Sequence, residues 1–261
     1  MARKLLNTRG AVRAIVAALR AAADPGRAER ERRYLKSDLR HLGVSVPAIR
    51  RAVASFARRQ PELERRDVLA VVRALWAEPV HERRMAAVEM LVRYEHHLGP
   101  ADMRLVERLI REARTWALVD VLATTVAGRL VERFSEAAGE LDRWAADDDF
   151  WVRRAAMLAL LQPLRRGEGD FERFGRYADR MLEEPEFFIR KAIGWVLRET
   201  AKERPGLVAR WLRPRAGRAS GVTVREAVKY LPEDEGAAIL RAQRAGSRRG
   251  RAGRSTKPPG R

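Results

Sequence analysis

Apolar residues recur at steps of three and four along nearly the whole chain, which is the spacing of one face of an α-helix. The pattern is clearest over residues 46–56, 68–76, 103–110 and 118–130. Alternation of apolar and polar residues, which would indicate β-strands, is not sustained anywhere. Proline and glycine interrupt the pattern repeatedly, as in Asp24-Pro25-Gly26 and Arg204-Pro205-Gly206, so that helices of about 10–18 residues are expected.

Four similar segments follow one another in the middle of the chain. They begin at His81, Trp116, Trp151 and Phe188, which lie 35, 35 and 37 residues apart, and a weaker copy occupies residues 46–51. Each continues with small or apolar residues, and three of the four carry basic residues at the third and fourth positions. A repeat of this length is typical of an α-solenoid, in which each pair of helices buries its apolar face against the next pair. The sequence therefore predicts an all-α fold, a HEAT-like α-solenoid of stacked helix pairs with one concave face; chance similarity among arginine- and alanine-rich helices is the alternative.

The apolar pattern ends near Arg244, after which glycine, arginine, serine and proline dominate. We therefore expect one repeat domain over residues 1–243 and a disordered, arginine-rich tail over residues 244–261. The net charge of the chain is +19, and residues 241–261 contribute eight of these positive charges. The remaining excess favours a polyanionic partner such as nucleic acid, although an arginine-rich composition without a binding role would have the same charge.

Several classes of site are excluded or not indicated. The chain contains no cysteine, which excludes disulfides, thiolate zinc sites and cysteine nucleophiles. No run approaches the ~18 apolar residues of a membrane helix, and no signal peptide follows Met1. We expect a monomeric cytoplasmic protein, nucleoid-associated if bacterial, with no membrane contact, no metal and no cofactor. The histidines lack a zinc-site spacing and are expected to be packed or solvated: His41, His81, His96 and His97.

The repeat register places chemically distinctive residues on one surface. Positions 1, 4, 5 and 8 of a unit share a helical face, because an α-helix has about 3.6 residues per turn. Trp116 and Asp120 occupy positions 1 and 5 of one unit. Arg154 occupies position 4 of the next unit, and Trp195 occupies position 8 of the unit after that. Two indoles, one carboxylate and basic side chains on one face would suit an anionic backbone that carries a flat cationic group.

These residues belong to motifs of a known family. From about Arg33 to about Tyr230 the chain resembles the AlkD-like DNA alkylation repair glycosylases, which are HEAT-like repeat proteins. The resemblance rests on WALVD at residues 116–120, FWVRRAA at 150–156 and EFFIRKAIGWVLRE at 186–199, with YLK at 34–36 and HLGVSVP at 41–47. It implies that an Asp, two Trp and an Arg surround the damaged nucleotide, at positions that match Asp120, Trp116, Trp195 and Arg154. It also implies excision of N3- and N7-alkylated purines without flipping of the base into a pocket.

The chemistry of such a lesion agrees with these four residues. An N3- or N7-alkylpurine is cationic and already a good leaving group, so the enzyme must stabilise the oxocarbenium-like sugar rather than protonate the base. Asp120 would supply the negative charge and orient water, Trp116 and Trp195 would hold the sugar and phosphate, and Arg154 would clamp a phosphate. We therefore predict a DNA-N-glycosylase of base excision repair that releases bases of the 3-methyladenine and 7-methylguanine type from duplex DNA.

Further side chains are candidate contacts to the alkylated duplex, although Trp151 could equally belong to the core. They are Tyr34, Arg84, Trp151, Arg153, Arg190 and Lys191. Family members often carry a second Trp just before the residue that matches Trp116 and an acid just after it, where this chain has Thr115 and Ala117. These departures leave the preferred lesion open. The alternatives are a non-catalytic HEAT scaffold that binds DNA or branched nucleic acid, and a protein-interaction solenoid.

Overall fold

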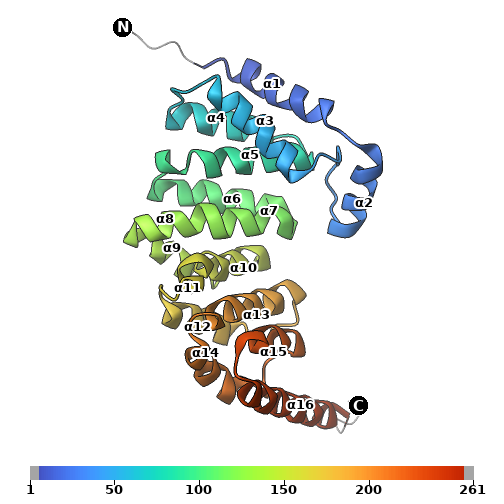
Figure 1. The fold of residues 1–261 in the computed structure, drawn as a ribbon, viewed down its shortest axis with the longest axis vertical. Helices are drawn as coiled ribbons and strands as arrows, with labels where there is room; N and C mark the ends of the chain where they lie inside the picture. Colours follow the sequence, from blue (N-terminus) through green and yellow to red (C-terminus); the bar gives the residue numbers. More distant parts are fainter. Residues whose placement is uncertain (1–5, 256–261) are drawn as a thin grey trace, which may run out of the picture. The chain divides into compact units, whose positions relative to one another are not determined.

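The computed structural model describes residues 6–255, and its regular structure is helical apart from one isolated β-bridge between Arg40 and Val80 (Figure 1). The all-α prediction is therefore confirmed. Contacts between Cα atoms divide the chain into two compact units, Met1–Phe134 and Ser135–Arg261, where the sequence predicts a single repeat domain. Each helix pair of a repeat protein contacts only its neighbours, so a repeat domain can be divided into compact units between one pair and the next. No helix within residues 6–255 is long and apolar enough to cross a membrane.

The first unit is built from helices that lie side by side (Figure 1). They are α1 (Thr8–Ala21), α2 (Pro25–Leu35), α3 (Val46–Arg58), α4 (Arg65–Trp76), α5 (His81–Arg93), α6 (Met103–Ala113), α7 (Trp116–Val121) and α8 (Gly128–Arg133). Helix α5 packs against α3 and α4, and α1 covers the same two helices. The apolar stripes meet in a core that includes the fully buried side chains Ile15, Ile49 and Leu75. Helix α2 differs, because none of its residues is buried.

The helix that begins at Trp116 changes its winding halfway along. Between α7 and α8 lies a π-helical segment, η3 (Leu122–Ala127). The hydroxyl of Thr124 donates a hydrogen bond of 2.7 Å to the backbone carbonyl of Asp120, one turn earlier. Segments of π-helix are rare in proteins and are frequent at functional sites. The change of winding begins two residues after Asp120, and it marks this turn as a candidate functional region independently of the sequence motifs.

The second unit is centred on one long helix. Its helices are α9 (Ala138–Trp144), α10 (Phe150–Leu158), α11 (Leu161–Arg165), α12 (Phe171–Arg180), α13 (Phe187–Ala201), α14 (Pro205–Leu212), α15 (Gly221–Ala227) and α16 (Glu233–Ser255). Helix α13 packs against α10, α11, α14 and α15. Gly194 allows α15 to approach closely, because a Cβ atom at this position would lie 2.8 Å from Cβ of Glu226 and 3.0 Å from the carbonyl oxygen of Thr223.

Helix α16 continues beyond Arg244, the residue at which the sequence predicts the start of a disordered tail. A close contact between two glycines accounts for part of this extension. A Cβ atom on Gly246 would lie 2.3 Å from the carbonyl oxygen of Gly217, so only a residue without a side chain at position 246 permits this approach. The contact ties the helix to the second unit past Arg244. Residues 256–261 of the predicted tail lie outside the described residues.

The four repeated segments occupy equivalent places in the helices. His81 and Trp116 are the first residues of α5 and α7, and Trp151 and Phe188 are the second residues of α10 and α13. Each segment therefore opens a helix, as a repeat register requires. This agreement supports the repeat register from which the candidate site is derived.

Candidate functional site

Trp116 opens α7 and meets Tyr34, which lies near the end of α2. The two ring centroids are 6.0 Å apart and the ring planes are inclined at 83°, an edge-to-face contact. Tyr34 is 73% exposed, whereas Trp116 is half-buried. The structure thus brings together two predicted site residues that are far apart in the sequence. Their contact places a largely solvent-accessible aromatic ring beside the indole.

Asp120 lies one helical turn after Trp116 in α7 and is half-buried. Residues four apart in an α-helix lie on the same face, so the carboxylate and the indole share one side of α7. Thr115, which precedes the helix, is buried, and its hydroxyl has no hydrogen-bond partner among the described residues. The first unit therefore combines the indole of Trp116 and the partly accessible carboxylate of Asp120, both on α7, with the exposed ring of Tyr34 on α2.

Arg84 is half-buried in the first unit and already makes several contacts. Its Nη1 donates a hydrogen bond of 2.6 Å to the carbonyl oxygen of Glu112, and its guanidinium carbon lies 4.9 Å from the ring centroid of Trp76. Burial lowers the pKa of this guanidinium, partly offset by the charge of Glu112. These contacts give Arg84 a role in the packing between α5 and neighbouring helices, and the half-buried side chain keeps some surface in solvent.

Arg154, in the second unit, is only 3% exposed. Its Nη1 donates a hydrogen bond of 2.5 Å to the carbonyl oxygen of Phe188, and its guanidinium carbon lies 5.9 Å from the centroid of that phenyl ring. Trp151 is also buried and packs against Phe188, with 4.8 Å between the ring centroids. Both residues join the first turn of α10 to the first turn of α13. In this position little of the Arg154 side chain is accessible from solvent.

Three other predicted DNA contacts form polar interactions within the second unit. Arg153 pairs in bidentate fashion with the carboxylate of Glu184, at 3.1 and 2.8 Å. Arg190 donates from Nε to the carbonyl oxygen of Glu184 at 2.6 Å, and Lys191 pairs with Glu226 at 3.0 Å. All three basic side chains are half-buried. They therefore keep some surface in solvent, but carboxylates neutralise part of the charge of Arg153 and Lys191.

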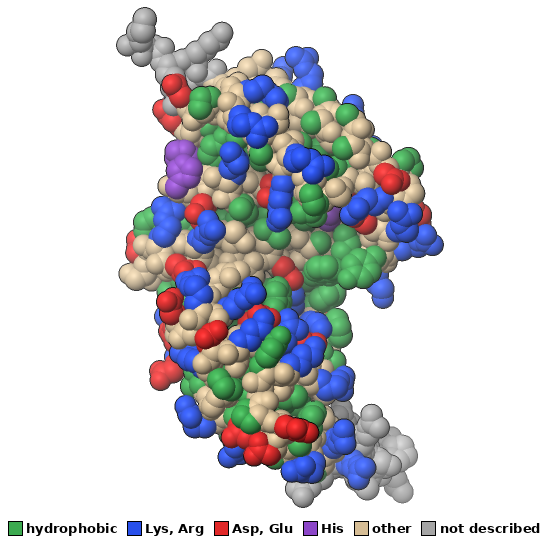
Figure 2. All heavy atoms as spheres, viewed as in Figure 1, with side chains coloured by type: hydrophobic (Ala, Val, Ile, Leu, Met, Phe, Trp, Pro, Cys, Tyr) green, Lys and Arg blue, Asp and Glu red, His purple; other side chains and the backbone are tan. Residues whose placement is uncertain are grey.

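Trp195 is half-buried on α13, almost two turns after Phe188. It is the second indole of the predicted site, and it belongs to the second unit together with Arg154. Trp116, Asp120 and Tyr34 belong to the first unit. Figure 2 shows that lysine and arginine side chains are spread over the visible surface of each unit, with acidic side chains among them. The basic surface expected from the net charge is therefore interspersed with ion pairs.

Glu226 is a member of this surface that the motifs do not reveal. Its carboxylate accepts hydrogen bonds from Lys191 and Lys229, at 3.0 and 3.1 Å, and forms a further short contact with Arg198. The one available signal in the sequence is its distance of 35 residues from Lys191, which is one repeat. Burial alone would raise the pKa of Glu226, but the hydrogen bonds from both lysines and the charge of Arg198 outweigh it and lower this pKa to about 2.

This ion cluster predicts a pH dependence of stability. Because the folded-state pKa of Glu226 is below its unfolded value, its contribution is complete above about pH 4.5 and is lost as the pH falls towards 2. We expect the urea midpoint of the wild type to fall more steeply between pH 5 and 3 than that of Glu226→Gln. Glu183→Gln, which alters an exposed pair with Arg218, should behave like the wild type. Parallel curves for the wild type and Glu226→Gln would contradict this assignment.

Comparisons with known proteins agree with the motifs. The family described as DNA alkylation repair enzyme matches residues 15–231. A predicted DNA alkylation repair enzyme from Enterococcus faecalis has a similar structure, with a TM-score of 0.71 and 20% sequence identity over 81% of this chain and 97% of that one. AlkD2 from Streptococcus mutans has a TM-score of 0.57 and 16% identity over 78% of this chain and 99% of its own. No curated protein matches the chain.

Proposed function

The chain belongs to the family of DNA alkylation repair enzymes, and we propose that it is a DNA-N-glycosylase that releases cationic alkylated purines from duplex DNA. The observation that carries this proposal is the arrangement at the start of α7. Asp120 lies one turn from Trp116, and the exposed ring of Tyr34 contacts that indole. Aromatic side chains beside a carboxylate suit a reaction in which positive charge develops on a sugar.

The proposed reaction breaks the bond between C1′ of the deoxyribose and the purine nitrogen. Because the alkylated base is cationic, it leaves as a neutral molecule with the bonding electron pair, and no protonation is needed. Positive charge then builds up on C1′ and the ring oxygen, where the carboxylate of Asp120 would stabilise it. Water adds to C1′ and loses a proton to the carboxylate or to solvent. The products are a free base and an abasic site.

The aromatic residues would position the damaged nucleotide. Tyr34 presents a largely exposed ring, and Trp116 presents the part of its indole that is not covered by Tyr34. Contacts between ring faces and a cation are worth about 0.5–2 kcal/mol, which would favour an alkylated base over a normal one. In the proposed mechanism Trp195, on α13 of the second unit, is a further aromatic contact to the DNA, a role that the family resemblance implies. The base remains in or near the stack, as the family resemblance implies.

The burial of Arg154 changes the role that we propose for it. Its hydrogen bond to Phe188 holds the first turn of α13, the helix that carries Arg190, Lys191 and Trp195. We therefore assign Arg154 to the positioning of α13 and leave the phosphate contacts to more exposed cations on that helix. A buried guanidinium that already has a carbonyl partner is better suited to hold a helix than to bind a phosphate of a mobile substrate.

The proposal is tested by base release from duplex DNA that contains 7-methylguanine or 3-methyladenine. We expect release of the free base under single-turnover conditions, no cleavage of normal purines, and no strand break until the abasic product is treated with alkali. Binding should weaken steeply with salt, because phosphate contacts release counterions. Binding without release of any alkylated base would overturn the enzyme assignment and favour a non-catalytic DNA scaffold.

A further inference from the structure

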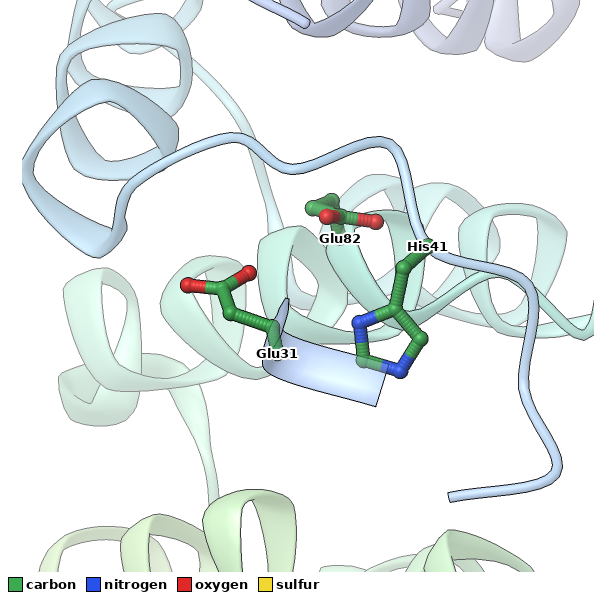
Figure 3. Close-up of side chains that lie close together, drawn as sticks. All are labelled: Glu31, His41 and Glu82. Atoms are coloured by element: carbon green, nitrogen blue, oxygen red, sulfur yellow. The ribbon is translucent and has the colours of Figure 1, made fainter. Parts of the chain in front are cut away.

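Three side chains of the kind that bind metal ions meet where α2 joins the rest of the first unit (Figure 3). They are Glu31 of α2, His41 of the following loop and Glu82 of α5. One potential ligand atom of each residue lies within 4.8 Å of the corresponding atoms of the other two. Figure 3 shows that the three side chains come from three separate segments and surround a common space.

The imidazole of His41 lacks the partners that a buried imidazole normally has. Both of its ring nitrogens are buried and have no hydrogen-bond partner among the described residues. The ring stacks on that of His81 with 4.6 Å between the centroids, and His81 is only 6% exposed, with a buried Nδ1 that is also unpartnered. Buried polar atoms are rarely left without a partner, so three such nitrogens in one place indicate a bound species.

The two carboxylates retain capacity for a further ligand. Glu82 is fully buried and accepts hydrogen bonds from the backbone N–H groups of Leu42, Gly43 and Val44. A carboxylate has about four lone-pair positions, so one remains. Glu31 accepts two bonds from Arg27, both at Oε1. Neither carboxylate is therefore saturated by the interactions that hold it in place.

The surroundings suit a cation that arrives from solvent. His41 is half-buried and lies beside the carboxylates of Glu31 and Glu82, so a cation would meet negative charge there. His41 also lines a cavity of about 600 Å³ together with Glu29, Arg32, Asp38 and Arg40. This cavity provides a route by which an ion could reach the cluster.

We propose that Glu31, His41 and Glu82 form a binding site for a divalent transition-metal ion of the zinc class. An imidazole with two carboxylates selects such ions over magnesium and calcium, which prefer oxygen ligands alone. Zinc lies about 2.0–2.2 Å from nitrogen and oxygen ligands, which places tetrahedral ligands about 3.4 Å apart. The present separations permit this after small side-chain rotations. Water would complete the coordination.

The position of the site indicates that a bound ion would stabilise the attachment of α2 to the rest of the first unit. Helix α2 has no buried residue, and its following loop is held to α5 by the bridge between Arg40 and Val80 and by Glu82. A metal ion bound to Glu31, His41 and Glu82 would connect α2 directly to this loop and to α5. Since α2 carries Tyr34, the ion would also fix the ring that contacts Trp116. None of the three ligands is assigned a step in base release, so metal binding can be tested independently of the proposed glycosylase activity.

The test uses the full chain without a histidine tag, stripped with a chelator and titrated with Co²⁺ or Zn²⁺. We expect one equivalent to bind, visible d–d absorption with Co²⁺, and a melting temperature that rises by several degrees with excess Zn²⁺. His41→Gln and Glu31→Gln should each weaken binding about tenfold or more, while Mg²⁺ and Ca²⁺ should not compete. Glu82 is left unchanged because it also holds the loop.

Matched controls are available elsewhere in the first unit. Glu78→Gln removes an exposed carboxylate just before α5, and His97→Gln removes an imidazole outside the cluster; both should bind metal like the wild type. Circular dichroism establishes whether each variant is folded. If His41→Gln does not fold, the metal affinity of Glu31→Gln provides the test. Failure to bind one equivalent, or equal affinity for the wild type and Glu31→Gln, would overturn the proposal and leave a cluster satisfied by water.

Discussion

Replacement of Asp120 by asparagine is expected to reduce single-turnover release of 7-methylguanine from duplex DNA by about 100-fold or more. The substitution keeps the size and shape of the side chain but removes the negative charge that would stabilise the oxocarbenium-like sugar. Because a cationic base needs no general acid, electrostatic stabilisation by this carboxylate is the main contribution that the protein can make to the chemical step. Affinity for the alkylated duplex should change much less than the rate, since the phosphate contacts are unaltered.

Asp148→Asn is a matched control for this experiment. Asp148 is exposed, and its backbone carbonyl accepts a hydrogen bond from Arg153. The substitution does not alter this carbonyl group. This variant should release base at the wild-type rate. Equal rates for the wild type and Asp120→Asn would exclude a role for the carboxylate in the reaction. A parallel loss of DNA affinity and rate would instead assign Asp120 to binding.

Replacement of Glu82 by alanine is expected to lower the free energy of unfolding by about 3–5 kcal/mol. The carboxylate is fully buried and accepts hydrogen bonds of 2.9, 2.6 and 3.3 Å from three successive backbone N–H groups, those of Leu42, Gly43 and Val44. Without it these donors lose their partner in a place where the backbone has little room to move. Urea denaturation with a chelator present measures the effect without a contribution from metal.

The rigidity of this loop is the reason for the size of the expected effect. Gly43 has a φ angle of +77°, and a Cβ atom there would lie 2.0 Å from the carbonyl oxygen of Asp24. The loop therefore packs closely against the beginning of α2, with its N–H groups directed to Glu82. Glu78→Ala, which alters a half-exposed carboxylate just before α5, should change stability by less than about 0.5 kcal/mol. A loss below about 1 kcal/mol for Glu82→Ala would contradict the assigned role.

The sequence by itself determined the helical fold, the repeat register and the family. Apolar spacing depends only on the local geometry of the helix, so it locates helices without knowledge of their partners. The repeated segments that begin at Trp116 and Trp151 open α7 and α10, as the register requires. The motif that contains Asp120 was likewise visible, because its Trp and Asp are only four residues apart. The role of the Asp120 carboxylate in base release remains a proposal, which the Asp120→Asn experiment tests.

Only the tertiary structure decided which charged and aromatic side chains are accessible. Arg154 and Arg84 have the same position in the repeat, yet Arg154 is buried against Phe188, whereas Arg84 is half-buried. Lys191 meets Glu226 one repeat later, and Tyr34 reaches Trp116 from a distant helix. The partners in these contacts lie far from one another in sequence and meet only after neighbouring helices have packed. A periodic pattern in the sequence shows which face of a helix is apolar. The distance between packed helices determines which polar side chains outside that face become buried.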